Sequence, residues 1–413
     1  MKRFQVNFST QTPVALRAGR EQSHSDTLGY VPGSALLGAL AWAHQHLGRN
    51  KEEFAHWFLQ GHVQVSNLYP TLQIMGKDKT KSDVASNPVL PMPLTARTCK
   101  RFDGFRYKAD LDGEDRHGVR DALISLALLA LTENKKPEVL AGIGTCNSCG
   151  QRMDDARGFY TRGALPEQVA ATQCELALRT HVGIHSRTKA AARQVLYNRQ
   201  VIPAETPFWG EWLAADDATY QQFEAFLADA DDAGWLRLGT NRTRGLGCYK
   251  AGLLPVDDET DKELKGLHER ITAFTALLKQ QAAHYDIATP AAAYVPLTLT
   301  SDLLLLDVLL RPQLALTDET LLGLGLTGAH TCYSAAKAKR IEGWSDLWGL
   351  PKPDQLALGM GAVFVVALDA LTDEACTRLL AWQTEGIGLR RAEGFGRLRV
   401  ADSFHTDFFG EAK

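Results

Sequence analysis

Alternating apolar and polar residues predict an extended segment at the start of each half of the chain. In RFQVNFSTQ at 3–11, Phe4, Val6 and Phe8 alternate with mainly polar neighbours. A period of two is typical of a strand with one buried face. The segment AYVPLTLTS at 293–301 is the second such stretch. Both are therefore predicted to be β-strands.

The apolar spacing then changes to that of a helix. After the first strand, YVPGSALLGALAWAHQHL places its leucines on one stripe behind Pro32. Proline suits the first turn of a helix, where its missing N–H has no intrahelical partner. A strand followed by a helix is the order predicted here.

Two glycine-rich loops, GTNRTRGLG at 239–247 and GLRRAEGFG at 388–396, agree at their first, fourth, seventh and ninth positions. Each follows a strand pattern and then a helix pattern, at 206–214 and 218–230 in the first case and at 362–370 and 372–383 in the second. Ordered agreement of this kind indicates an internal repeat.

We therefore expect an α+β fold of two tandem ferredoxin-like domains, each an antiparallel sheet backed by two helices. A chain of 413 residues is long enough for two such cores. The first domain is predicted at 1–256, with an insertion at about 70–175. A helical connection at 257–290 would lead to a smaller second domain at 291–413.

The first glycine loop does not have the pattern of a nucleotide-binding loop. No Gly-Lys-Ser/Thr closes it, and CYKAGLLPV, which follows, is typical of a strand. The dinucleotide fingerprint requires a helix at that point. A mononucleotide or dinucleotide site is thus not predicted.

Composition indicates a globular protein of the cytoplasm. Hydrophobic residues make up 45% and charged residues 23% of the chain, and its apolar runs are too short to span a bilayer. Seven largely isolated cysteines do not form a secreted disulfide pattern. We expect a reduced cytoplasmic protein without a membrane partner.

Charge is distributed unevenly, although the net charge is only −3. No Asp or Glu occurs from Leu176 to Ala204, and this basic stretch carries Arg179, His181, His185, Arg187, Lys189, Arg193 and Arg199. A basic patch on a nearly neutral protein favours a phosphate-bearing partner. A solvated basic face is the alternative from charge alone.

TCNSCG at 145–150 places Cys146 and Cys149 two residues apart, which is half of a zinc knuckle. The predicted remaining ligands are Cys99 and His117, with Cys174 as a weaker option. A structural zinc would cross-link an insertion that has few periodic elements of its own. Otherwise, the two cysteines are reduced thiols in a loop.

Several motifs together resemble the RAMP superfamily of CRISPR-associated proteins: PGSALLGAL, LYNRQVIPAETPFWGEW and the two glycine-rich loops. More narrowly, PLTARTCKRF, HGVRDALI, TCNSCG, RTHVGIHSRTKAA and GWSDLWGLPKP resemble the Csx-ten family, the Cas-five-like subunit of type III-D effector complexes.

This resemblance implies two RRM-like domains and a structural, non-catalytic subunit at the end of a ribonucleoprotein filament in antiviral defence. The subunit would cap the 5′ handle of the CRISPR RNA. Its implied partners are the large polymerase-like subunit and the backbone RAMP subunits, with the target nucleic acid contacted indirectly. The backbone subunits are implied to cut target RNA.

An unpaired RNA handle needs cations and backbone amides for its phosphates and planar groups for its bases. The predicted RNA-binding residues are Arg179, His181, His185, Arg187, Lys189 and Arg193 in the basic stretch, Gly239, Arg242, Arg244, Gly245 and Gly247 in the first loop, and Arg391, Gly394 and Gly396 in the second. Tyr197, Phe208, Trp209 and Tyr249 are candidate stacking faces, with burial in the core as the alternative.

Two other functions remain open from the sequence. A metal-independent RAMP endoribonuclease would need a base and an acid, for which His24 with Tyr30, or His181 and His185 with Lys189, supply the residue types. A protein-only scaffold would use the basic surface to dock acidic partners. In the second loop, Arg390, Arg391 and Arg397 surround Glu393 and can instead seat a neighbouring protein.

Overall fold

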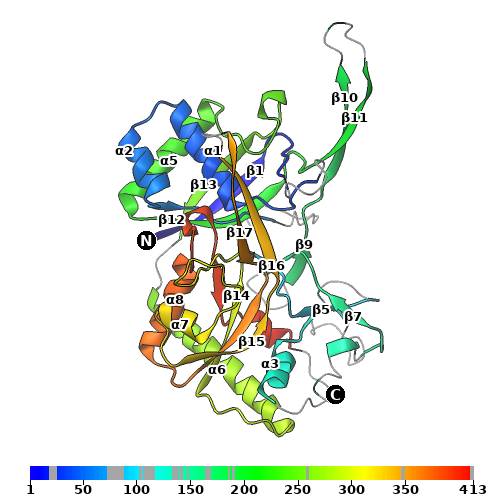
Figure 1. The fold of residues 1–413 in the computed structure, drawn as a ribbon, viewed down its shortest axis with the longest axis vertical. Coiled ribbons are helices and arrows are strands. Elements are labelled where there is room, and N and C mark those ends of the chain that lie inside the picture. The colour runs from blue at the N-terminus through cyan, green and yellow to red at the C-terminus, as the bar shows by residue number, and fades with distance from the viewer. Residues whose placement is uncertain are drawn as a thin grey trace, which may run out of the picture. The chain divides into compact units, whose positions relative to one another are not determined.

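The structure is a computed structural model, which describes residues 1–17, 26–71, 88–101, 105, 117–132, 139, 143–146, 148–162, 169–184, 187, 191–256, 260–345 and 349–409, without the side chains of 184 and 191–197. The chain forms two compact units (Figure 1). Unit 1 comprises 1–89, 172–258 and 392–394, and unit 2 comprises 90–171, 259–391 and 395–413. The fold is mixed α/β with several small antiparallel sheets.

Unit 1 is built on a five-stranded sheet in the order β13-β1-β12-β2, with β3 also pairing with β12. These strands are β1 (Lys2–Thr10), β2 (Val63–Gln64), β3 (Tyr69–Pro70), β12 (Pro207–Ala214) and β13 (Tyr249–Pro255). Its helices are α1 (Gly33–His46), α2 (Lys51–Phe54), which continues as the π-helical turn η1 (Ala55–Leu59), and α5 (Asp217–Asp232).

The predicted alternation in the first strand matches its burial. Phe4, Val6 and Phe8 are buried in one cluster with Leu36 of α1 and Phe223 of α5. The intervening residues of β1 are only partly buried. The two helices thus supply the apolar cover for one face of the sheet.

Unit 2 contains a four-stranded sheet in the order β15-β18-β14-β19. The strands are β14 (Ala293–Leu299), β15 (Ala329–Ala335), β18 (Val363–Leu368) and β19 (Leu398–Val400). The helices are α3 (Leu123–Leu131), α6 (Thr260–His284), α7 (Asp318–Gly323), α8 (Asp373–Glu385) and α9 (Phe404–Asp407).

Smaller sheets complete the described part of the chain. They have the orders β4-β8-β9, β6-β5-β7, β10-β11 and β16-β17. Their strands are β4 (Val89–Pro91), β5 (Ala96–Cys99), β6 (Arg120–Asp121), β7 (Met153–Asp155), β8 (Phe159–Arg162), β9 (Val169–Thr172), β10 (Ala177–Ile184), β11 (Ala191–Val201), β16 (Ala338–Ser345) and β17 (Leu350–Leu358).

The compact units differ from the predicted domain boundaries. Residues 90–171, expected as an insertion in the first domain, cluster with unit 2. The reason is the apolar face of α3, where Leu123 and Leu128 share a buried cluster with Tyr294 and Val365 of the unit 2 sheet. Likewise α6, expected as a connection at 257–290, is part of the unit 2 core.

Candidate metal centre and nucleic-acid interface

A three-stranded sheet in unit 2 brings together three segments that carry metal-ligand chemistry. Cys99 is the last residue of β5, and β5 lies between β6 and β7. His117 precedes β6, and the turn with Cys146 and Cys149 precedes β7. Cys99 is paired with Met153 of β7. Strand pairing therefore places the three segments at one edge.

The knuckle itself is held by two backbone hydrogen bonds. The N–H of Cys146 donates to the carbonyl of Gln151 at 2.7 Å, and the N–H of Gly150 donates to the carbonyl of Cys146 at 2.7 Å. Gly150 has φ 66°, a left-handed conformation that glycine adopts without a steric penalty. This tight turn allows both thiols to face the same point.

The four donor atoms have the spacing of a tetrahedral zinc site. The Sγ atoms of Cys99 and Cys149 are 3.6 Å apart, and His117 Nδ1 is 3.8 Å from Cys99 Sγ and 3.4 Å from Cys146 Sγ. Zinc bonds of ~2.3 Å to sulfur and ~2.0 Å to nitrogen would place tetrahedral ligands about 3.5–3.8 Å apart. All four donors lie within 4.8 Å of one another.

Burial and charge also fit a cation. Cys99, His117 and Cys146 are buried, and Cys149 is partly exposed. Desolvation raises the pKa of Cys149, and the neighbouring Cys99 and Cys146 thiols raise it further. A divalent ion would reverse that effect, because it binds and stabilises thiolates. The cluster can hold a metal such as zinc, whereas Cys174 belongs to the core of unit 1.

The predicted basic stretch forms a two-stranded hairpin in unit 1. Figure 1 shows β10 and β11 extending beyond the sheet of the same unit. Arg179 pairs with Arg199, and His181 pairs with Tyr197. Directly paired residues share one face of an antiparallel ladder, so Arg179, His181 and Arg199 lie on a single basic face.

The opposite face of this hairpin has a different character. Leu178 and Val182 are exposed, and Thr180 Oγ1 donates to Asn198 Oδ1 at 2.8 Å. Because side chains alternate along each strand, these residues point away from the basic face. The hairpin thus offers one cationic and one partly apolar surface.

Hydrogen bonds fix the first glycine loop against the segment that follows β1. The N–H of Thr240 donates to the carbonyl of Ala15 at 3.0 Å, and that of Gly247 donates to the carbonyl of Pro13 at 2.9 Å. A Cβ atom on Gly247 would lie 2.2 Å from the carbonyl oxygen of Leu238. The glycine is therefore required by a close approach within the protein.

The tip of that loop is a single turn of 3-10 helix, η3 (Arg242–Arg244). Arg242 places its guanidinium 4.9 Å from the ring centre of Trp42, while Arg244 and Gly245 are exposed. Cation–π contacts of this kind restrain an arginine without neutralising it. The sequence gave no sign of Trp42, because the two residues lie far apart along the chain.

A hydrogen bond joins the hairpin to the first loop. Arg199 Nη1 donates to Thr240 Oγ1 at 3.4 Å. Arg199 lies in β11 and Thr240 at the start of the loop, so two basic stretches that are separate in sequence lie side by side in unit 1.

The second loop has equivalent hydrogen bonds in unit 2. Leu389 N–H donates to Leu304 at 3.0 Å, and Gly396 N–H donates to Asp302 at 2.9 Å. A Cβ atom on Gly396 would lie 1.8 Å from the Ile387 carbonyl oxygen. Its tip is η4 (Arg391–Glu393), and Arg391 Nη1 lies 3.6 Å from Glu385 Oε2.

Residues 392–394 of this loop belong to unit 1, where they are closely packed. The N–H of Val65 donates to Ala392 at 3.1 Å, and a Cβ atom on Gly394 would lie 2.9 Å from the Val65 carbonyl oxygen. These glycine positions contact protein backbone, which is also the environment of Gly247.

The remaining predicted residues divide into two groups. Phe208, Trp209 and Tyr249 are buried, so the core interpretation of these aromatic rings describes the structure. His24, His185 and Lys189 lie outside the described residues, as do the side chains of Arg193 and Tyr197.

Comparison with known families gives a match over the first half of the chain. A sequence model described as the RAMP superfamily matches residues 7–250. The chain belongs to the RAMP superfamily. The matched range includes both the basic hairpin and the first glycine loop, whereas no curated protein matches the chain significantly.

Solved structures with some likeness to this RAMP chain come from CRISPR complexes. A chain of the type III-B Cmr-beta complex bound to cognate target RNA and AMPPnP is 12% identical, with a TM-score of 0.38 over 87% of this chain and 86% of that one. Oligomeric Cmr4 from Pyrococcus furiosus is 14% identical, with a TM-score of 0.26 over 62% of this chain and 100% of that one. A type IV-B CRISPR complex chain is 13% identical, with a TM-score of 0.25 over 61% and 90%, respectively.

Within the described residues, no helix of this RAMP chain combines the length and apolar character that a bilayer span requires.

Proposed function

We propose that this protein is a structural, RNA-binding subunit of a type III CRISPR-Cas effector complex of the III-D kind, where it caps the 5′ handle of the CRISPR RNA. Membership of the RAMP superfamily supports an RNA-binding role. The Csx-ten resemblance of the sequence supports the narrower position in the complex.

The observation that carries this proposal is the hydrogen bond between Arg199 and Thr240. It places the basic face of the hairpin beside the tip of the first glycine loop. Arg179 on the hairpin and Arg244 on the loop are both exposed. Forked guanidinium donors on neighbouring elements suit successive phosphates of a single strand.

Binding would depend more on side chains than on loop amides. The N–H groups of Thr240 and Gly247 already donate to protein carbonyls. The exposed tip at Arg244 and Gly245 is the part of the loop that remains open to a phosphate. Arg242, restrained on Trp42, would position this tip.

We further propose that the two halves are tandem ferredoxin-like domains. The β13-β1-β12-β2 order of unit 1 and the β19-β14-β18-β15 order of unit 2 support this, since each places the first strand between the last and the third. The Cys99, His117, Cys146 and Cys149 cluster would hold a structural zinc. The large polymerase-like subunit and backbone RAMP subunits would be the protein partners, and the target nucleic acid would be contacted indirectly.

Fluorescence anisotropy with a labelled RNA that carries the 5′ end of the native CRISPR repeat tests the RNA site. The Arg179→Ala/Arg244→Ala variant should bind at least about tenfold more weakly, with a salt dependence reduced by roughly two phosphate contacts. Arg340→Ala, which removes an exposed arginine of unit 2, is the matched control. Equal affinities for the wild type and the double variant would contradict the proposed site.

A further inference from the structure

A tight turn in unit 2 presents three consecutive aliphatic side chains to solvent. Val308, Leu309 and Leu310 are 88%, 67% and 77% exposed. Leu304 and Leu305, a few residues earlier, are buried in the core. Single exposed aliphatic residues are ordinary on protein surfaces, but a contiguous group marks an interaction site.

The turn is held in shape by the carboxylate of Asp307. It accepts hydrogen bonds from the N–H of Leu309 at 2.8 Å, the N–H of Arg311 at 2.9 Å and Arg311 Nε at 2.7 Å. Leu310 has φ 61°, a left-handed conformation that is unfavourable for a branched side chain. Its N–H donates to the Asp307 carbonyl at 2.9 Å. The aliphatic side chains are thus displayed by an ordered turn.

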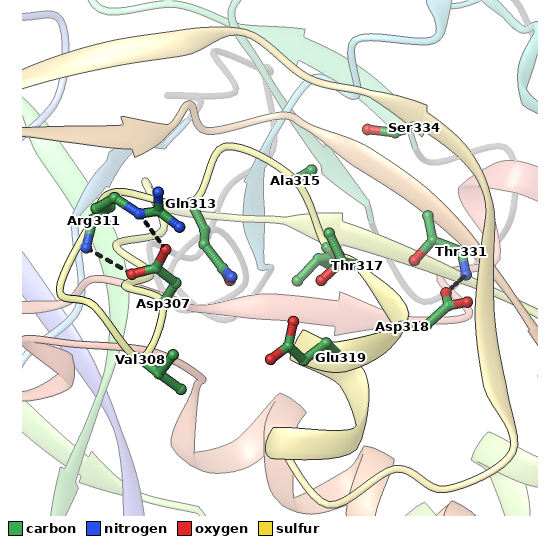
Figure 2. Close-up of a pocket in the computed structure, with 11 residues that line it drawn as sticks. Asp307, Val308, Arg311, Gln313, Ala315, Thr317, Asp318, Glu319, Thr331 and Ser334 are labelled. Carbon is green, nitrogen blue, oxygen red and sulfur yellow. Dashed lines mark hydrogen bonds and ion pairs between the residues drawn. The ribbon is translucent and has the colours of Figure 1, made fainter.

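A hollow of about 700 Å³ lies beside this turn, between it and the start of α7. Figure 2 shows Gln313 and Glu319 directed toward its centre from opposite sides. Asp307, Asp318 and Glu319 in the lining face one arginine, Arg311. The hollow is therefore acidic on balance.

Asp318 is oriented by its neighbours on β15. Its Oδ1 accepts from the N–H of Thr331 at 3.1 Å, and its Oδ2 lies 2.9 Å from His330 Nδ1. Thr317 caps α7, because its side chain accepts from the N–H of Thr320. These contacts fix the far wall of the hollow relative to the turn.

We propose that the Val308–Leu310 turn and the adjacent hollow form a docking surface for another protein subunit. The partner would bury the three aliphatic side chains in an apolar recess and place a lysine or arginine in the hollow beside Glu319. Charge complementarity favours a basic protein segment over RNA, because the carboxylates repel phosphate. The partner's membership of the same ribonucleoprotein rests on the function proposed above.

The test uses the tagged full-length protein purified from its native cell. Proteins that copurify with the wild type are identified by mass spectrometry, purified separately, and titrated against immobilised wild type, Leu309→Ser and Glu319→Arg. Leu254→Ser, which alters an exposed leucine of unit 1, is the control. Circular dichroism and thermal unfolding establish that each variant is folded.

Both variants should weaken binding of the same protein at least tenfold while Leu254→Ser and RNA retention stay unchanged. Binding of every copurified protein at wild-type strength would overturn the docking surface alone. Loss of RNA with all proteins retained would also overturn it, since the surface would then bind nucleic acid. A wild type that binds a protein lost by the variants, but carries no RNA, would retain this surface and refute the RNA-binding function. A wild type without any protein partner would refute both.

Discussion

His405 and Asp121 lie 284 residues apart in sequence, yet His405 Nδ1 is 2.6 Å from Asp121 Oδ2 in the interior of unit 2. Thr298 Oγ1 lies 2.7 Å from His405 Nε2, and Thr95 Oγ1 donates to Asp121 Oδ1 at 2.6 Å. All four side chains are buried. Their network ties α9 to β6 and to β14.

Replacing Asp121 with alanine should destabilise unit 2 by about 3 kcal/mol, because His405 would keep a buried ring nitrogen without its partner. Chemical denaturation followed by circular dichroism measures this change. Asp354→Ala is the control, since Asp354 forms an exposed pair with Arg340 at 2.6 Å and should contribute less than about 1 kcal/mol. Equal stabilities for the two variants would show that the buried network is not stabilising.

Zinc should be present at about one ion per chain in protein purified without chelators. Cys146→Ser removes one of four ligands, so metal content should fall to less than about a tenth of an equivalent. Elemental analysis by inductively coupled plasma mass spectrometry gives the value. Cys248→Ser, a cysteine outside the cluster, should keep its metal.

Metal removal should loosen the β6-β5-β7 region in particular. Hydrogen exchange after treatment with a strong chelator should rise around Cys99 and Met153 and stay constant in β1 of unit 1. Exchange that is unchanged throughout the protein would mean that the four residues pack together without needing an ion.

The zinc ligands could be predicted because few cysteines and histidines occupy the stretch before β7. The CxxC spacing identified Cys146 and Cys149, and the structure brings Cys99 and His117 to them. Pairing of Asp121 with His405 could not be predicted, since only the folded chain brings these distant residues together. For the same reason, α3 could be predicted as apolar but could not be assigned to unit 2.

The glycine loops show a similar limit. Their repeated glycines suggested an anion-binding backbone, whereas Gly247 lies against the Leu238 carbonyl and Gly396 against the Ile387 carbonyl. A sequence pattern identifies a place where a side chain is excluded, but it does not say whether protein backbone or a ligand fills that space.

Gly247→Ala should destabilise unit 1 by about 1–3 kcal/mol, because its φ of 93° is unfavourable for alanine and the added Cβ meets backbone. Gly38→Ala in α1 is the matched control. Nothing lies within 4 Å of its added Cβ, and alanine should stabilise the exposed helix position by about 0.5–1 kcal/mol. Denaturation midpoints that move in the same direction for both would contradict the close-approach explanation.

The His330–Asp318 pair predicts a specific pH dependence. The hydrogen bond from His330 lowers the pKa of Asp318 below its ordinary 3.8, and the hydrogen bond to Asp318 raises the pKa of His330 above its ordinary 6.5. The stabilisation from His330 is complete below 6.5 and is lost as pH rises through its higher folded pKa. The stabilisation from Asp318 is present above 3.8 and is lost as pH falls through its lower folded pKa.

Asp318→Asn should therefore lower the pKa of His330 toward 6.5. Nuclear magnetic resonance titration of the histidine ring protons measures it directly. His268, on α6, is an internal reference whose titration should be the same in both proteins. An unshifted His330 in the variant would show that the pair does not persist in solution.

Sequencing the RNA that copurifies with the native, tagged protein tests the central claim most directly. The proposed function predicts short CRISPR RNAs that share one 5′ end, recovered together with several larger effector subunits. RNA-free protein, or RNA of random sequence without a common 5′ end, would contradict a subunit that caps the CRISPR RNA handle.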